Sequence, residues 1–316
     1  MPTRRNFLKT TAATGLGATL GLNLASCGLD VPYLDTVGLQ IWTIRDLLAA
    51  DPVAALRGVK AAGYRQIELM DTAQLPDLLP IAQDLGLAVN SSFINWSAVT
   101  GRWDLRTDNP TPVEFEAIVA EAKRAGLSDL VFGYVMKGNR ERKDDYKRLA
   151  DQLNRAGELA QSAGIQLSYH NHSFEFEPLA DAAFTRKLAA FDDYKYGYEI
   201  LMDRVEDPLC RFEVDVFWVA LGGEEPQKVI NRLGERTHLL HLKDLNPTYE
   251  EPIWDEGAVP EDAFQELGDG EVDIVRCMNL GKTFGVKYCF VEQDQSPAPL
   301  ESIAQSRTYL DQRAAS

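Results

Sequence analysis

Two of the four histidines in this 316-residue chain stand one residue apart in the stretch YHNHSFE, residues 169–175. His170 and His172 share this stretch with Glu175, directly after an apolar segment. Imidazole near neutral pH can bind a divalent metal or act as a general base. Buried histidines and acids are costly unless they are paired or ligated. The stretch therefore predicts a metal or proton-transfer site, or else two histidines that bond to neighbouring carbonyl groups.

Other polar residues also stand at the ends of apolar segments: Gln40, Glu68, Glu213, Asp215, His241, Lys243 and Glu292. Asp215, His241 and Glu292 offer two carboxylates and one imidazole, a set that suits Mn²⁺, Co²⁺, Zn²⁺ or Mg²⁺. A metal with an open coordination position polarises a carbonyl or enediolate. A buried hydrogen-bonded network is the alternative. Lys243 can donate to a developing oxyanion or pair with Asp244, and His238, at the start of its segment, is expected to be structural.

The elements that must position these residues alternate between apolar strands and amphipathic helices. Strands are expected at 37–42, 65–70, 87–93, 128–134, 165–171, 211–217, 237–242 and 286–292. Five of them directly follow a glycine that ends a helical pattern, and glycine readily adopts the left-handed conformation that closes a helix. Eight such units predict a single-domain α/β protein with a closed (β/α)₈ barrel. A doubly wound open sheet is the alternative, but no Gly-x-Gly-x-x-Gly motif follows the first strand.

Residues 1–27 have the layout of an export signal and are set apart from the barrel, which is assigned to residues 28–316. A basic start with paired Arg4 and Arg5 resembles a twin-arginine signal. The closing Leu24-Ala25-Ser26-Cys27 resembles a lipobox, in which Cys27 is lipidated. We expect an exported, periplasmic protein that meets a membrane only through a lipid anchor; an amphipathic helix of no special role is the alternative.

The charge and the cysteines narrow the possible functions. The formal net charge is −16, and the leader holds three basic residues and no acids, so the remainder carries −19. Nucleic-acid binding needs a basic surface, so no nucleic-acid partner is expected. Three cysteines without metal-like spacing remain beyond Cys27, which argues against a disulfide framework.

Several motifs together resemble the sugar phosphate isomerase/epimerase family, within the xylose-isomerase-like TIM barrel superfamily. They are GLQIWTIRD (38–46), YHNHSFEF (169–176), FEVDVFWVALGG (212–223), HLLHLKD (238–244) and YCFVEQD (288–294). The resemblance runs from about Val37 to about Gln312. It implies one divalent metal ion at the barrel mouth, held by side chains from strands five to eight.

On this resemblance, Asp215, His241 and Glu292 match three of the metal ligands. Relatives usually place a glutamate on strand five, as a ligand and as one of two proton-shuttling carboxylates, where this chain has His170. We expect His170 to be the fourth ligand and His172 to face the substrate. One acid–base role then passes to His172, Glu175 or Lys243, with Glu292 as the remaining carboxylate, or the reaction differs.

The substrate side of the mouth is expected to include Gln40, Trp42, Glu68 and Trp218. Aromatic residues there can stack on a sugar face, although core packing is the alternative for each of them. Phe93 stands where many relatives have a histidine, which makes the mouth more apolar. The stretch 245–272 is too long for a plain loop and is expected to form a lid or binding loop.

The leading hypothesis is a metal-dependent sugar isomerase or epimerase that abstracts a proton next to a carbonyl of a small sugar or glycoside. A keto-sugar or keto-glycoside lyase or dehydratase shares that step and needs only one base. Export and the lack of an evident arginine cluster favour unphosphorylated substrates. A non-catalytic sugar-binding barrel is the second class of function, and endonuclease chemistry is disfavoured by the few histidines and the acidic charge.

Overall fold

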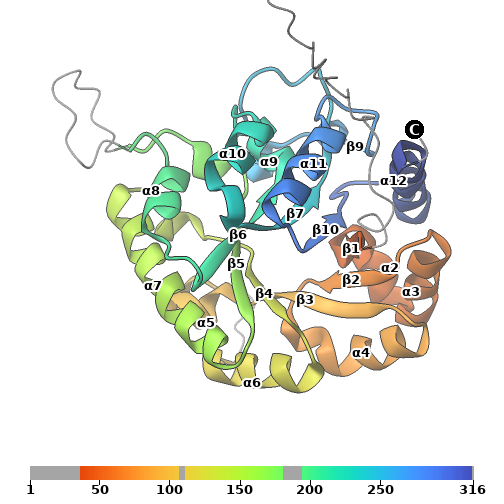
Figure 1. Ribbon diagram of the computed structural model, residues 1–316, viewed down its shortest axis with the longest axis horizontal. Helices are drawn as coiled ribbons and strands as arrows, with labels where there is room; N and C mark the ends of the chain where they lie inside the picture. The colour runs from red at the N-terminus through yellow and green to blue at the C-terminus, as the bar shows by residue number, and fades with distance from the viewer. Residues whose placement is uncertain (1–35, 107–110, 181–193, 315–316) are drawn as a thin grey trace, which may run out of the picture.

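Eight parallel strands close into a barrel in the computed structural model, which describes residues 36–106, 111–180 and 194–314 (Figure 1). The strands are β1 (Gly38–Gln40), β2 (Gln66–Leu69), β3 (Ala88–Ile94), β4 (Asp129–Phe132), β5 (Gln166–His170), β6 (Cys210–Asp215), β7 (Thr237–Leu242) and β10 (Tyr288–Val291). Their order around the barrel is β1-β10-β7-β6-β5-β4-β3-β2. The predicted (β/α)₈ barrel is confirmed, and the open-sheet alternative is excluded by this closure. Residues 1–27 lie outside the described ranges.

Helices surround the barrel and pack their apolar faces against it (Figure 1). They are α2 (Arg45–Ala50), α3 (Pro52–Ala61), α4 (Leu75–Asp84), α5 (Trp96–Thr100), α6 (Phe115–Ala125), α7 (Lys143–Ser162), α8 (Gly197–Arg204), α9 (Val216–Leu221), α10 (Pro226–Leu233), α11 (Ile274–Phe284) and α12 (Pro299–Ala314). In α6 the residues expected on the apolar face, Phe115, Ile118, Val119 and Ala122, are buried. Gly126 ends α6 with φ 83°, a conformation that other residues adopt only with strain.

Six strands end earlier than the sequence pattern indicates, and at β1, β5 and β6 the early end places side chains at the mouth. After β1 the chain turns into a 3₁₀ helix, η1 (Ile41–Ile44), so Trp42 lies on this turn and is 44% exposed. After β6 the chain enters α9 directly, and Oδ1 of Asp215 accepts a hydrogen bond from the Trp218 amide at 3.0 Å. After β5 a third turn, η5 (Phe174–Phe176), interrupts the extended chain.

The N-terminal end of the barrel has its own buried charge network. Nε2 of His238 lies 2.7 Å from Oδ1 of Asp129, and Nζ of Lys287 lies 2.8 Å from its Oδ2. These residues stand at the starts of β4, β7 and β10, opposite the ends that carry the other polar residues. The network explains why a histidine begins the seventh strand without belonging to the mouth.

The long excursion after β7 folds back over the mouth. It contains a two-stranded antiparallel sheet of β8 (Asp244–Leu245) and β9 (Phe264–Gln265), and two 3₁₀ turns, η7 (Glu256–Ala258) and η8 (Glu261–Ala263). The Asp244 carboxylate accepts hydrogen bonds from the backbone amides of Gly268 and Val272, each at 2.9 Å. Because these bonds tie both ends of the excursion together, its middle is held at the barrel mouth, where the Tyr134 hydroxyl donates to Glu256.

Candidate active site

A cavity of about 370 Å³ opens at the C-terminal mouth of the barrel. Among the residues proposed from sequence, it is lined by Gln40, Trp42, His170, His172, Trp218, Lys243 and Glu292. Phe93, which the sequence placed at the mouth, and Tyr134 also line it. The other wall residues are Met70, Gly133, Glu256, Val259, Phe264, Asp294 and Gln295. The volume suits one small ligand, and the mixture of aromatic and polar walls is typical of such sites.

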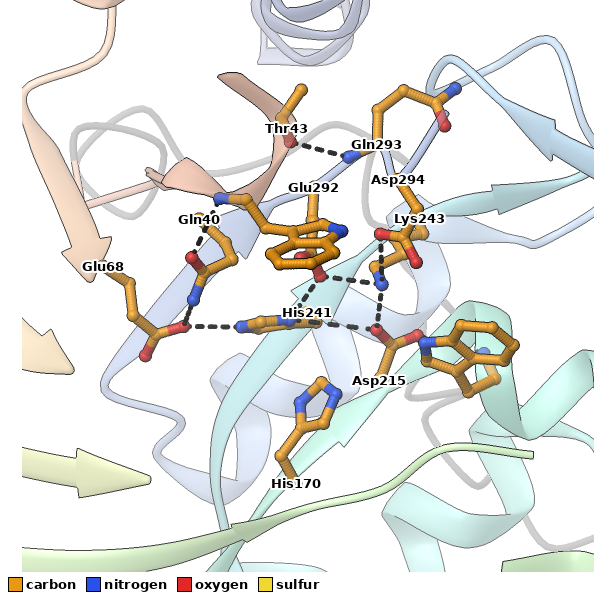
Figure 2. A network of polar contacts seen from close by, with 12 residues as sticks. Gln40, Thr43, Glu68, His170, Asp215, His241, Lys243, Glu292, Gln293 and Asp294 are labelled. Atoms are coloured by element: carbon orange, nitrogen blue, oxygen red, sulfur yellow. Dashed lines mark hydrogen bonds and ion pairs between the residues drawn. The ribbon is translucent and has the colours of Figure 1, made fainter. Parts of the chain in front are cut away.

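His241 lies beneath this cavity, with carboxylates on both sides of its ring. Nε2 lies 2.7 Å from Oε2 of Glu68, whereas Nδ1 lies 3.0 Å from Oε2 of Glu292 and 3.8 Å from Oδ2 of Asp215 (Figure 2). Burial alone would lower the pKa of His241, but Glu213, followed by Glu292 and Glu68, outweighs it and raises that pKa well above its usual range.

Glu68 does not line the cavity, although the sequence suggested a substrate contact. Its carboxylate accepts hydrogen bonds from Gln40 Nε2 at 2.9 Å and from the Ser91 hydroxyl, and it is fully buried. Gln40 and Glu68 are partners in the register of β1 and β2, which explains their contact. The structure therefore places Glu68 as the partner that orients His241.

Lys243 follows β7 and points its ammonium into the acidic cluster. Nζ lies 2.7 Å from Oε2 of Glu292, 2.9 Å from Oδ1 of Asp294 and 3.3 Å from Oδ2 of Asp215 (Figure 2). Burial alone would lower the pKa of Lys243, but these carboxylates raise it above its usual range. Asp244 instead accepts backbone amides, so the alternative pairing of Lys243 with Asp244 is wrong.

The two histidines of β5 and its extension have different surroundings. His170 Nδ1 lies 3.1 Å from Oε2 of Glu213, and the His170 ring lies 4.6 Å from the ring of His241. His172 stacks on Phe174 at 5.2 Å, and its Nδ1 has no hydrogen-bond partner among the described residues. Burial is the main cause that lowers the pKa of both imidazoles well below the usual range, so both are neutral.

Glu175 lies outside the cavity wall. Its carboxylate accepts hydrogen bonds from the Tyr169 hydroxyl and from the backbone amide of His172, the latter at 2.8 Å. Burial raises the pKa of Glu175 to about 8, against the opposing effect of Tyr169 and Arg140. The turn η5 breaks the strand periodicity and directs this side chain away from the mouth, where it holds the His172 backbone in place.

The remaining carboxylates differ in charge because their neighbours differ. Burial alone would raise the pKa of Glu292, but Lys243 and His241 lower it to about 2. Burial, followed by the neighbouring Glu68, raises the pKa of Glu213 to about 8. Burial also raises the pKa of Asp294 to about 6. The cavity therefore presents an ionised Glu292 beside a more weakly acidic Asp294, two residues farther along the chain.

The residues beneath the cavity fit a divalent metal ion. His170, Asp215 and His241 each offer one ligand atom, and these atoms lie within 4.8 Å of one another. Glu68, Glu213 and His241 form a second such group, which shares His241 with the first. Oδ2 of Asp215 is buried and accepts no hydrogen bond from the described residues, and the Lys243 ammonium lies 3.3 Å from it. The N/O donor set and the excess of carboxylates both suit a divalent cation.

Two aromatic side chains, Trp218 and Phe93, line the same cavity. Trp218 lies 5.1 Å from the His172 ring, and its Nε1 has no hydrogen-bond partner among the described residues. Phe93 stacks on His241 at 5.6 Å with an interplanar angle of 15°, so it closes one side of the imidazole cluster. An indole whose own N–H is unpaired can pack against a sugar ring and can also donate a hydrogen bond to a hydroxyl group of that sugar.

Glu213 and Asp294 were given no role from the sequence, although their spacing from Asp215 and Glu292 indicates that they belong to the site. Glu213 stands two residues before Asp215 on the same strand, so both side chains point to the barrel interior. Asp294 stands two residues beyond Glu292 in the motif VEQD. Glu256, Val259 and Phe264 belong to the excursion after β7, whose path no local pattern specifies.

Comparison with known families agrees with this architecture. Residues 56–313 match the family described as xylose isomerase-like TIM barrel, which confirms the resemblance seen in the motifs. Residues 1–21 match the signal sequence of the twin-arginine translocation pathway, so the chain is exported across a membrane. Within the described ranges, no helix combines the length and apolarity needed to cross a bilayer.

Individual relatives span different parts of the chain. An inosose dehydratase of Clostridium beijerinckii is 26% identical over 181 residues, which cover 54% of this chain and 55% of that protein. The chain thus spans about half the length of this curated relative. A solved sugar phosphate isomerase/epimerase of Parabacteroides distasonis has a TM-score of 0.64 and 23% identity, over 95% of this chain and 99% of that one.

A third comparison concerns a solved protein that contains a metal. The IolI protein with a bound zinc atom has a TM-score of 0.61 and 15% identity, over 89% of this chain and 98% of that chain. At such identities the solved structures establish the fold that this chain shares with them.

Proposed function

Since the chain belongs to the xylose isomerase-like TIM barrel family, we propose that it is a divalent-metal-dependent enzyme that removes a proton next to the carbonyl of a sugar-like substrate. The reaction favoured here is elimination, as in a keto-sugar or keto-glycoside lyase or dehydratase. Isomerisation or epimerisation, to which the motifs pointed first, begins with the same proton abstraction and is the second candidate.

The observation that carries elimination is the base available at the cavity. Two-carboxylate epimerisation needs a base on each face of the reacting carbon, and β5 places His170 where the second carboxylate would be. His170 is hydrogen-bonded to Glu213, whereas His172 is partly exposed at the cavity and forms no ion pair with a carboxylate of the described residues. A neutral imidazole in that setting is suited to accept one proton, and elimination requires only one base.

The proposed step assigns a role to each charged group. His172 takes the proton from the carbon next to the carbonyl, and the electron pair left there forms a double bond as the bond to the leaving oxygen breaks. The leaving oxygen takes a proton from Asp294, whose raised pKa keeps it protonated more often than Glu292. Lys243 donates to the negative charge that develops on the carbonyl oxygen.

The ligands proposed for the metal are His170, Asp215, His241 and Glu292, with Glu68 orienting His241. When bound there, the ion supplies Lewis-acid polarisation of the substrate carbonyl. Glu175 is proposed to act by holding the His172 backbone, because it does not line the cavity. Gln40, Trp42 and Trp218 line it and are proposed to contact the substrate. The similarity to curated inosose dehydratases supports an elimination reaction, and the zinc-containing IolI protein supports a divalent metal at this site.

We also propose that the protein works in the periplasm as a lipoprotein anchored through Cys27. The twin-arginine signal supports export, and the LASC sequence that follows it supports lipidation. A cell grown with labelled palmitate should then yield a labelled protein, and a Cys27→Ala variant should carry no label.

The test of the reaction uses Mn²⁺-loaded protein with keto-glycosides and keto-cyclitols in D₂O, followed by NMR and by absorbance of the conjugated ketone. Elimination predicts an unsaturated ketone and free aglycone or water. His172→Gln should lower kcat by roughly 10²–10⁴-fold and leave metal content unchanged. Phe174→Leu, which alters the stacking partner of His172 and keeps the base, is the matched control.

Three other outcomes would redirect the proposal. Deuterium at the inverted carbon without elimination would establish epimerisation. Tight sugar binding without turnover would establish a non-catalytic sugar-binding barrel. A protein that neither contains nor binds a divalent metal would overturn the metal-dependent mechanism.

A further inference from the structure

A second, larger cavity of about 710 Å³ lies at the mouth beside the first. Its walls come from three segments that follow different strands: 137–142 after β4, 174–180 after β5, and 252–255 in the excursion after β7. In the second cavity, Phe174, Leu179, Pro252, Ile253 and Trp254 supply apolar and aromatic surface. Asp255 of the second cavity is followed directly by Glu256 of the first, so the two cavities are neighbours at the mouth.

The wall between the cavities is a set of stacked rings. His172 and Tyr134 line the first cavity, and Phe174 lines the second. Phe174 stacks on His172 at 5.2 Å with an interplanar angle of 7°, and it contacts Tyr134 edge-on at 5.9 Å. The proposed base and the second cavity are therefore separated by the thickness of one aromatic ring.

Arg140 is the unusual group of the second cavity. Its guanidinium carbon lies 3.3 Å from the centre of the Phe174 ring and 5.7 Å from the Tyr134 ring. Nη1 is buried without a hydrogen-bond partner, and Arg140 forms no ion pair within the described part of the chain. A guanidinium that packs against a ring and has no carboxylate partner can still pair with a carboxylate or another oxyanion.

The other charges around the cavity do not neutralise Arg140. Lys137 and Arg142 add positive charge, while Glu141, Glu177 and Asp255 add negative charge, but none of these acids lies within ion-pair distance of Arg140 among the described residues. Glu175 feels the field of Arg140, which lowers its pKa against the effect of burial, but the two groups form no direct contact. If Arg140 had only a structural role, its electrostatic effect on Glu175 would be its only interaction with a nearby acid.

We propose that the cavity around Arg140 is a second subsite that binds the anionic group, a carboxylate or a sulfate ester, of a sugar unit next to the reacting ring. The inference rests on the proposed function in placing that ring in the first cavity. The substrate class is then an acidic disaccharide or glycoside: it is unphosphorylated, its reacting unit is neutral, and its charge lies at the far end.

The test compares the affinities of cellobiose, cellobiouronic acid and cellobiose 6′-sulfate by calorimetry at low salt, with the full exported protein and without turnover. At least one anionic disaccharide should bind about tenfold or more tightly than cellobiose, because a charge-assisted pair with Arg140 is added. Arg140→Gln should remove that preference and leave the affinity for cellobiose unchanged. Arg155→Gln, which removes an exposed positive charge on α7, is the matched control and should keep the preference.

The two anionic disaccharides distinguish the possible ligands. Tighter binding of cellobiouronic acid indicates a uronic acid, and tighter binding of cellobiose 6′-sulfate indicates a sulfated sugar. Equal affinity for all three sugars, or no binding below roughly 10 mM for any of them, would overturn the subsite. A preference that survives in Arg140→Gln would also overturn it. If the protein turns over keto-sugars but does not prefer anionic disaccharides over cellobiose, only the subsite is refuted. If it prefers anionic disaccharides but turns over no keto-sugar, only the proposed reaction is refuted.

Discussion

The ammonium of Lys243 lies 2.7 Å from Oε2 of Glu292, the same oxygen that lies 3.0 Å from Nδ1 of His241. The lysine and the imidazole therefore share a carboxylate that is also a proposed metal ligand. Lys243 makes a second such contact, at 3.3 Å from Oδ2 of Asp215. The Lys243 ammonium and a bound divalent ion would therefore compete for the same carboxylate oxygens of Glu292 and Asp215.

This competition predicts that Lys243→Met binds Mn²⁺ more tightly than the wild type, by about tenfold or more, because a neighbouring like charge is removed. Calorimetric titration of metal-stripped protein measures the affinity directly. Lys287→Met, which removes a lysine from the opposite end of the barrel, should leave Mn²⁺ affinity unchanged. Weaker Mn²⁺ binding in Lys243→Met would show that the lysine supports the metal site.

Glu68→Gln is expected to weaken metal binding by about 10–100-fold without removing a proposed ligand. The carboxylate of Glu68 holds Nε2 of His241 at 2.7 Å and so directs Nδ1 toward Asp215 and Glu292. A neutral amide weakens this orientation. Metal content after dialysis against a graded chelator series measures the loss, with the exposed Glu158→Gln as control. An unchanged chelator midpoint in Glu68→Gln would contradict the orienting role.

Asp129→Asn should destabilise the fold by about 3 kcal/mol, because it leaves Lys287 and His238 without their buried partner. Burial alone would raise the pKa of Asp129, but His238 and Lys287 lower it below its usual value of 3.8. A lowered folded pKa means that the stabilisation is present above pH 3.8 and is lost as pH falls through the folded pKa.

Urea denaturation of wild type and Asp129→Asn should therefore show a constant difference near neutral pH that shrinks in acid. Metal content should stay unchanged, since the network lies at the far end of the barrel from the mouth. A difference that persists undiminished in acid would mean that packing, and not charge, is the cause.

Glu175 should make stability fall as pH rises. Burial raises its pKa from 4.5 to about 8, so between these values the folded state binds more protons than the unfolded state. Unfolding free energy then decreases across that window by up to about 1.4 kcal/mol per pH unit and remains low above it. Glu175→Gln removes this dependence, so its stability relative to wild type should improve steadily from acid to alkaline pH.

Denaturant midpoints at about pH 5, 7 and 9 would measure this trend. At the acid end Glu175→Gln is expected to be the less stable protein, because the amide loses one of the two hydrogen bonds that Tyr169 and the His172 amide donate to the carboxyl. Parallel curves for the two proteins would show that the carboxyl stays ionised throughout.

Much of the architecture could be read from local patterns. Glycines that end helices, apolar strands buried on both faces and helical spacing of apolar residues locate all eight barrel strands, because each pattern reflects burial of a short segment. Parallel strands bring their C-terminal ends together, so polar residues at those ends converge. His170, Asp215 and His241 lie together for this reason.

The sequence by itself thus determined the barrel, the end of it that carries the polar cluster and the residues from which a metal site can be built. Tertiary structure decided how each side chain is used: Glu68 contacts His241, Lys243 contacts Glu292, and Glu175 turns to Tyr169. These pairings depend on the closure of the barrel and on short 3₁₀ turns that break strand periodicity. Local composition specifies which residues are buried, but contacts across a closed sheet arise only when distant segments fix one another's positions.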